Sequence, residues 1–402
     1  MRRALNNLFG LGLVALGLVA FAAAPAAAQA IETATAVPGF GWTVTPSLLA
    51  NTTWDDNALV RGSGDVAPKD LVHVVNPRLD ADYRGRRGEF TGNYDGAFRM
   101  YRTLSDLNSY DQDASVSGRR LLTKHLSIFA RNQYTVAPTT EQLDLVGVPY
   151  IRTGSKNEYL SGGVDAALSK RVTLTASYNF QNVQFQQAQS LSYLLVGGHS
   201  HGASVLVRRA ITDKVSVTGS YNLQVATVGA INDDAFEIHS AQAGVERRLS
   251  DHVRLAVAGG IARLAGNATG PARTGPSISA SLTRQFQIGT VNVAYDRAFV
   301  PSYGFGGTQQ NEEVRANARV PLGRALYSQG SFAWRRNEPL VSGAKKLHTV
   351  AYEGSIGYML APWVGVEGFF DSSSQRLDMP GGTSDHHQLG VQIVTTKPMR
   401  IR

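Results

Sequence analysis

The sequence of 402 residues contains no cysteine, and charged residues make up only 17% of it. The absence of cysteine excludes a disulfide scaffold, a cysteine-based zinc site and a thiol enzyme. The charged fraction is below the roughly 25% of a typical soluble domain. After residue 30, no apolar run approaches the ~20 residues that a membrane-spanning helix needs. A helical membrane protein is therefore not expected, and a soluble domain would be unusually poor in charge.

The first thirty residues have the organisation of a secretory signal peptide. Arg2 and Arg3 precede an apolar run over 8–24, and a stretch of small residues over 26–28 follows. A positive segment, a short apolar segment and a small-residue cleavage site together define such a signal. The alternative is a membrane anchor, for which the run is short. We expect cleavage after Ala28, with Ala30 as the second choice, and export of the mature chain.

The mature chain alternates between apolar and polar residues instead of showing a helical period. Val172, Leu174, Ala176, Tyr178 and Phe180 are apolar, and the residues between them are polar. The same alternation recurs over 89–99, 215–224 and 349–358. Successive side chains of a strand point to opposite faces, so each segment predicts a strand with one apolar and one polar face.

These segments are joined alternately by short basic links and by longer polar or glycine-rich links. Short links contain RGRRGE, LSKRV and ERRLSDHV, and long ones include 57–70, 137–156 and 301–310. Strands of ten or more residues exceed the ~5–6 usual in globular sheets and match the ~9–11 that cross a bilayer. We therefore predict an all-β, antiparallel, up-and-down transmembrane barrel of about eighteen strands. A soluble sandwich, propeller or solenoid is the alternative.

The prediction divides the chain into a signal peptide over 1–28, a short periplasmic segment over 29–40 and an outer-membrane barrel over 41–402. Aromatic residues near strand ends, such as Trp42, Trp363, Tyr101, Tyr150 and Phe369, suit interfacial girdles. Many outer-membrane barrels end in an aromatic residue, whereas this chain ends HHQLGVQIVTTKPMRIR. The last strand, expected over 386–397, is therefore either recognised without that residue or placed differently.

The polar faces of the expected strands would line the lumen, and a dry core could not solvate so many charges of both signs. The predicted lumen residues are Arg78, Asp80, Asp82, Glu89, Asp95, Arg99, Asp111, Asp113, Arg131, Asp165, Arg254, Asp296, Arg315, Arg319, Arg335, Glu353 and Glu367. At about eighteen strands a barrel is wide enough for an aqueous channel. The path is either a general diffusion pore or selective for a particular solute. Tyr159, Tyr327 and Trp54 are candidate stacking platforms for sugar rings.

Basic residues concentrate at the short links and predict a positive rim on the periplasmic side. The rim comprises Arg86, Arg87, Arg119, Arg120, Lys170, Arg171, Arg208, Arg209, Arg247 and Arg248. Its simplest interpretation is contact with lipid headgroups. The alternative is docking of a periplasmic partner or an anionic polymer. Nucleic-acid binding is not expected of an exported barrel without a recognition element.

No catalytic motif of the GxSxG, HExxH or P-loop type occurs, and we predict neither an enzyme nor a bound cofactor or metal. His199 and His201 share one strand face and are the best candidate metal pair. That face continues into residues that we assign to lipid. His386 and His387 point to opposite faces of a strand and cannot chelate together. A hydrolase triad assembled in space is the least favoured alternative.

Three stretches resemble the type 2 outer-membrane β-barrel porin family of Gram-negative bacteria. They are TPSLLANTTWDDNALV (45–60), the segment over 70–108, and DASVSGRRLLTKHLSIFARNQY (113–134). Later hairpins over 169–185 and 212–224 are similar to the same family. The resemblance covers nearly the whole mature chain, and the tetrapeptides at 54–57 and 76–79 are its more specific motifs. It implies an outer-membrane channel without catalysis and, as in some members, a role in exopolysaccharide or capsule secretion with a periplasmic export protein.

The sequence thus predicts a barrel in contact with outer-membrane lipid that passes solute or polysaccharide. Alternatives are a secretion barrel with a periplasmic partner, and a scaffold or adhesion barrel whose lumen is plugged. The link over 137–156 is long enough to fold inward and constrict the lumen. The oligomeric state and the transported solute are not predicted.

Overall fold

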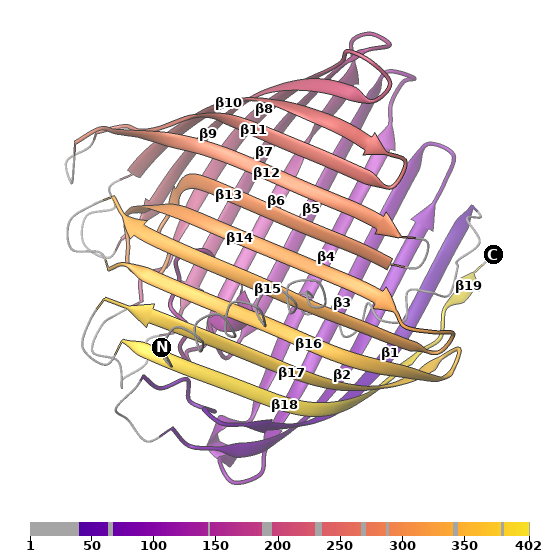
Figure 1. The fold of residues 1–402 in the computed structure, drawn as a ribbon, viewed down its shortest axis with the longest axis vertical. Helices are drawn as coiled ribbons and strands as arrows, with labels where there is room; N and C mark the ends of the chain where they lie inside the picture. Colours follow the sequence, from indigo (N-terminus) through magenta and orange to yellow (C-terminus); the bar gives the residue numbers. More distant parts are fainter. Residues whose placement is uncertain are drawn as a thin grey trace, which may run out of the picture.

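The computed structural model is a closed antiparallel β-barrel, viewed from the side in Figure 1. It describes residues 40–62, 67–143, 145–186, 195–229, 235–266, 271–286, 289–340, 345–378 and 382–401. The predicted signal peptide (1–28) and nearly all of the segment over 29–40 lie outside these residues. Among the described residues, no helix is long and apolar enough to cross a membrane.

Each strand pairs with its neighbours in sequence, and β1 closes the ring against β18. The strands are β1 (Gly41–Asp55), β2 (Asp70–Arg84), β3 (Gly88–Tyr101), β4 (Ser109–Leu121), β5 (Leu126–Ala137), β6 (Ser155–Ala167), β7 (Val172–Phe185), β8 (Gly198–Ala210), β9 (Val215–Val228), β10 (Ala235–Ser250), β11 (Val253–Leu264), β12 (Arg273–Phe286), β13 (Gly289–Pro301), β14 (Thr308–Pro321), β15 (Leu326–Pro339), β16 (Leu347–Ala361), β17 (Val364–Leu377), β18 (Thr383–Thr396) and β19 (Met399–Ile401). Two 3₁₀ turns, η2 (Ser105–Leu107) and η3 (Glu141–Leu143), lie in long links.

The prediction of an all-β barrel of about eighteen strands is confirmed, and the soluble alternatives are wrong. The short β19 follows Pro398 and pairs with Trp42–Val44, so it extends the seam and adds no full strand to the wall. The expected last strand over 386–397 corresponds to β18, and its pairing with β1 runs from Asp55–Gln388 to Ser47–Thr396. The barrel closes through this pairing without a terminal aromatic residue.

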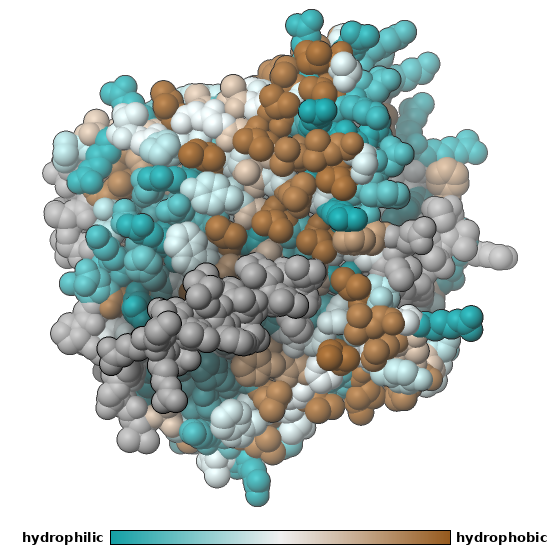
Figure 2. Space-filling view, viewed as in Figure 1, coloured by the Kyte–Doolittle hydropathy of each residue, from teal (hydrophilic) through white to brown (hydrophobic). Residues whose placement is uncertain are grey.

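The two faces of the wall differ in polarity, as the alternation predicts. Outward side chains include large exposed apolar residues such as Leu160, Val257 and Ile393. Figure 2 shows a brown apolar band running across the strands, with hydrophilic residues on either side of it. A closed sheet has no unpaired edge, so it can cross a bilayer with all its backbone groups bonded. The apolar band identifies the part of the outer surface that faces lipid.

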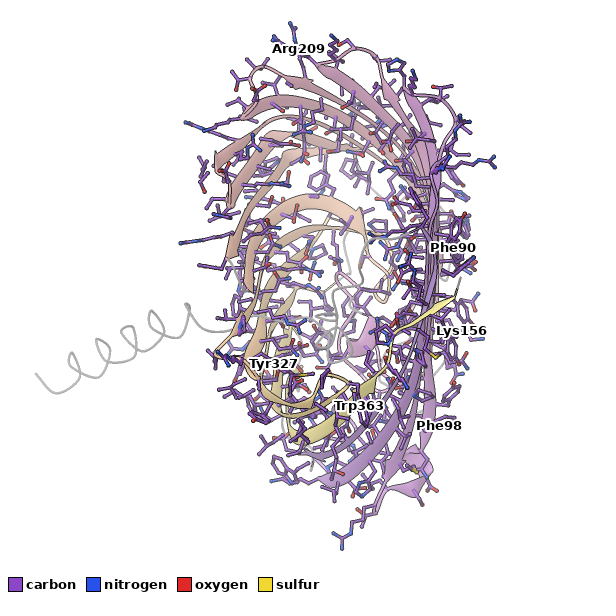
Figure 3. The ribbon with its side chains drawn as sticks, turned by 90° about the vertical axis from the view of Figure 1, so that its right-hand side faces the viewer. Phe90, Phe98, Lys156, Arg209, Tyr327 and Trp363 are labelled. Carbon is purple, nitrogen blue, oxygen red and sulfur yellow. The ribbon has the colours of Figure 1, made fainter. Side chains whose placement is uncertain are left out.

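Aromatic residues border this band on the outer surface. Trp42 packs against Tyr83 and Phe90 with ring centroids 5.1 and 5.7 Å away, near the short-turn end. Farther along the strands, Phe98 stacks on Tyr110 at 4.3 Å. Phe90 and Phe98 lie on the outside of the ring in Figure 3, which looks at the end of the barrel with the short turns. Such positions suit the two interfacial girdles of a membrane barrel.

Three residues that we expected in the girdles do not belong to them. Tyr101 and Tyr150 are buried, at 8% and 6% exposure. Phe369 pairs in register with Ser355 and Gly390, on the inward face. Tyr101 shares the inward face of β3 with Arg99 and packs there against Ala58 of the β1–β2 link. Tyr150 belongs to a link that enters the barrel.

Candidate functional site

All the predicted lumen residues lie on strands at positions that share the inward face. In register, Arg78 pairs with Asp95, Asp95 with Asp113, and Arg131 with Ser117. On the opposite wall, Glu353 pairs with Ser331, and Arg319 with Gln329. Paired residues of adjacent strands point to one face, so the alternation propagates around the ring. Whether these residues line a conducting path stays a prediction.

Two arginines on the inward face of β2 and β3 are paired with carboxylates. The Arg78 guanidinium donates to Asp80, with Nη2 2.9 Å from Oδ1. Arg99 is paired with Asp111 in the same way. Asp95 accepts a hydrogen bond from Asn76 Nδ2 at 2.6 Å. Arg78 and Arg99 are thus paired, but inward carboxylates outnumber inward arginines on β2–β4: Asp80, Asp82, Glu89, Asp95, Asp111 and Asp113 share the face with Arg78, Arg99 and Arg119. This part of the wall therefore presents an excess of acidic groups to the lumen.

A second network joins β14, β15 and β17 on the other side of the ring. Glu313 accepts from Arg335 Nε at 2.6 Å and also pairs with Arg315. Glu367 accepts from Gln329 Nε2 at 2.9 Å and from the Tyr327 hydroxyl at 3.1 Å. Arg335, Glu313 and Glu367 are all buried, so this network holds the wall together as much as it faces water.

Two long links turn into the barrel at the end opposite the short turns. The β5–β6 link reaches the far wall, where the backbone N–H of Tyr150 donates to Gln375 Oε1 at 2.6 Å. The β13–β14 link also packs inward, and Tyr303 donates from its hydroxyl to Ser200 Oγ at 2.9 Å. Burial raises the pKa of the Tyr303 phenol, which keeps that proton in place. The expectation that residues 137–156 fold inward agrees with these contacts.

The inward β5–β6 link is fastened by an ionic cluster that the sequence did not reveal. His386 lies 3.0 Å from Asp55 through Nε2 and 3.0 Å from Glu141 through Nδ1. Ser373 on β17 also donates to Glu141, at 2.5 Å. Alternation places His386 and Asp55 on the inward face, but only the path of the link brings Glu141 to them. By contrast, the inward position of Glu313 could have been predicted, because Glu313 lies two residues before Arg315 on the same strand and so points to the same face.

The predicted basic rim lies where the short links lie. Arg86 and Arg87 sit in the β2–β3 turn, Lys170 and Arg171 beside the β6–β7 turn, and the remaining members near the ends of β4, β8 and β10. All ten are exposed. Arg119 pairs with Asp165, and Arg208 with Glu246, whereas Arg209 projects from the outer surface in Figure 3. What this rim binds stays a prediction.

The structure places the candidate histidine pair outside the lumen and only some of the candidate sugar platforms inside it. His199 and His201 lie on the outward face, and His201 Nδ1 is 2.6 Å from the Tyr178 hydroxyl. The described residues contain no cluster of three or more histidines, aspartates or glutamates placed to hold a metal. Trp54 points outward and is no sugar platform, and Tyr327 is buried against Glu367. Tyr159 lies on the inward face of β6.

No family profile matches the sequence, and no curated protein is similar to it. Among solved structures, it is similar to OpdQ from Pseudomonas aeruginosa (11% identity, 89% of this chain and 98% of that chain, TM-score 0.43). It is also similar to OpdK from the same organism, determined with vanillate (9% identity, 89% and 99%, TM-score 0.45). A third similar structure is OccAB4 from Acinetobacter baumannii, with 10% identity, coverage of 90% of this chain and 99% of that chain, and a TM-score of 0.45. Similarity at this level does not establish a shared function. The strand pairing and the apolar outer band carry the assignment to a membrane barrel.

Proposed function

We propose that this protein is a porin-like channel of the bacterial outer membrane, which passes solute through its lumen without catalysis. The observation that carries the proposal is the difference in polarity between the two faces of the wall. Outward side chains form an apolar band. Inward side chains are polar or charged at most positions, with apolar clusters such as Val72 with Val74 and Phe236 with Ile238 near the ends of the strands that carry the long links. So many polar side chains need water to solvate them, and membrane barrels of this size enclose aqueous paths.

The test is single-channel conductance of the refolded mature chain in a planar bilayer, with heat-modifiable gel migration as the control for folding. Steady current steps are expected. A folded barrel that gives no current would contradict the channel and favour a plugged scaffold, for which the inward β5–β6 link would be the plug. Absence of any heat-modifiable form would contradict the membrane barrel itself.

A second candidate is a secretion barrel for an anionic polysaccharide that works with a periplasmic export protein. The exposed basic rim at the short-turn end favours it, because such a rim attracts anionic chains and acidic protein surfaces. Deletion of the gene would then trap polymer in the periplasm. Normal surface polysaccharide in the deletion strain would reject this candidate and leave the porin-like channel untouched.

A further inference from the structure

One sector of the lumen wall, formed by β6–β12, is rich in amides and hydroxyls and has its charges confined to the ends. In these strands the charged inward residues are Asp165, Arg208, Glu246, Arg248 and Arg254 near the short turns, and Arg273 at the other end of β12. Between them, beside apolar residues such as Leu206 and the alanines of β11, the inward face carries Asn157, Tyr159, Ser161, Ser177, Asn179, Gln181, Ser204, Ser220, Asn222, Gln224, Ser240, Gln242, Ser277 and Ser279. We call this set the neutral sector.

The neutral sector has side chains on neighbouring strands that already form hydrogen-bonded pairs. Ser177 and Ser204 hydroxyls are 2.6 Å apart, and Gln242 Nε2 donates to Ser277 Oγ at 2.8 Å. Gln181 Nε2 donates to Asn157 Oδ1 at 3.0 Å. These contacts fix the orientation of the groups, so a solute would meet donors and acceptors that are already held in place.

Other groups of the neutral sector keep their hydrogen-bonding capacity free. The side chains of Asn179, Asn222 and Tyr159 make no hydrogen bond with another described residue. Asn222 is exposed, and the other two are half-buried. An amide offers two donors and one acceptor, and a hydroxyl offers both roles, which is the same chemistry that a sugar hydroxyl presents.

A glycine on this face gives the Asn179 amide its space. Gly202 lies between Asn179 and Gln224 in register, and a Cβ atom there would stand 2.5 Å from Asn179 Oδ1. Gly163, Gly244 and Gly260 occupy further inward positions of the same strands. At Gly202 the Asn179 amide thus lies across the space that a side chain would fill, whereas at Gly163 the Phe129 ring occupies it.

We propose that the neutral sector binds uncharged polyhydroxylated solutes, that is, small saccharides, as they pass through the lumen. The proposal rests on the proposed channel and names its solute class. A carboxylate solute would need unpaired cations along the wall, and the described inward arginines of the neutral sector's strands lie only at its ends. An amide and hydroxyl wall leaves no charge unpaired when it binds a neutral hydroxyl-rich solute.

The experiment measures how sucrose, added to the bath, lowers the ion current through single channels of the full mature chain. A polyethylene glycol of similar size corrects for viscosity and exclusion, and gluconate is the charged comparator. The expected result is saturable inhibition by sucrose beyond the effect of the glycol, and weaker inhibition by gluconate.

The variants Asn179→Ala and Asn222→Ala should each raise the half-inhibiting sucrose concentration by about 2- to 10-fold, the effect of losing one hydrogen bond. The matched control is Asn182→Ala, on β7 but on the outward face, which should leave that concentration unchanged. A conducting channel that sucrose affects no more than glycol, or that gluconate inhibits more strongly, overturns the solute class and leaves the channel standing. Absence of conductance overturns the channel and this proposal together.

Discussion

His386 on β18 holds Glu141, 245 residues away in sequence, with its Nδ1 3.0 Å from the glutamate Oε2. The same imidazole contacts Asp55 on β1 through Nε2, so it joins the barrel seam to the inward β5–β6 link. Gln375 adds a second attachment, since its amide exchanges hydrogen bonds with the backbone of Tyr150. The position of the link in the lumen is thus set by side chains of the far wall.

Removing the glutamate should free the link. We expect Glu141→Ala channels to fluctuate between current levels more often than the wild type, because the link loses its bonds to His386 and Ser373. Single-channel recordings at fixed voltage measure this. Glu158→Ala, an outward carboxylate on β6, is the control and should not change the fluctuations. Equally quiet recordings from both variants would show that Glu141 does not hold the link, which then rests on its other contacts, among them those of Gln375 and Arg152.

The alternation of residues predicted the strands and the face to which each charge points, because a period of two is a local property of the chain. The link over 137–156 shows the limit of that reasoning. Its length allowed inward folding, but Glu141, Tyr150 and Arg152 acquire partners far away in sequence that no spacing reveals. Trp54 shows the opposite case: we expected it as a stacking platform, although its alternation with Asp55, which shares the inward face, could have excluded it.

The buried ion pair between Arg335 and Glu313 should contribute more to the free energy of unfolding than the exposed pair between Arg336 and Glu338. Arg335 and Glu313 side chains are 3% and 7% exposed, whereas the Arg336 side chain is 43% exposed. Arg335→Met should lower the free energy of unfolding by about 1–3 kcal/mol, because the buried Glu313 carboxylate loses one of its two arginine partners. Arg336→Met should change it by about 0–1 kcal/mol. Urea unfolding in detergent, followed by gel mobility, compares the two; equal effects would contradict the burial of the pair.

The arginines at the short-turn mouth should govern ion selectivity. Arg248 and Arg254 are directly paired on the inward face, and Arg247 is the outward neighbour. Arg248→Gln and Arg254→Gln should each move the reversal potential in a salt gradient toward cation selectivity, since a positive charge leaves the path. The Arg247→Gln variant should not move it. A shift with Arg247→Gln alone would mean that ions do not pass this part of the lumen.

The apolar band predicts that an arginine introduced on the outward face of β10 destabilises the barrel far more than one introduced on its inward face. Val245 lies outward on β10, flanked in register by Val217 and Val257, and all three are exposed. Because lipid cannot solvate a guanidinium, Val245→Arg should cost about 2–4 kcal/mol if it lies near the bilayer midplane. Gln242→Arg, on the inward face of the same strand, should cost far less, because the lumen supplies water to the charge. Unfolding of both variants in lipid vesicles measures the difference. A larger loss for Gln242→Arg would mean that the lumen beside β10 is dry, which would also contradict an aqueous path along the neutral sector.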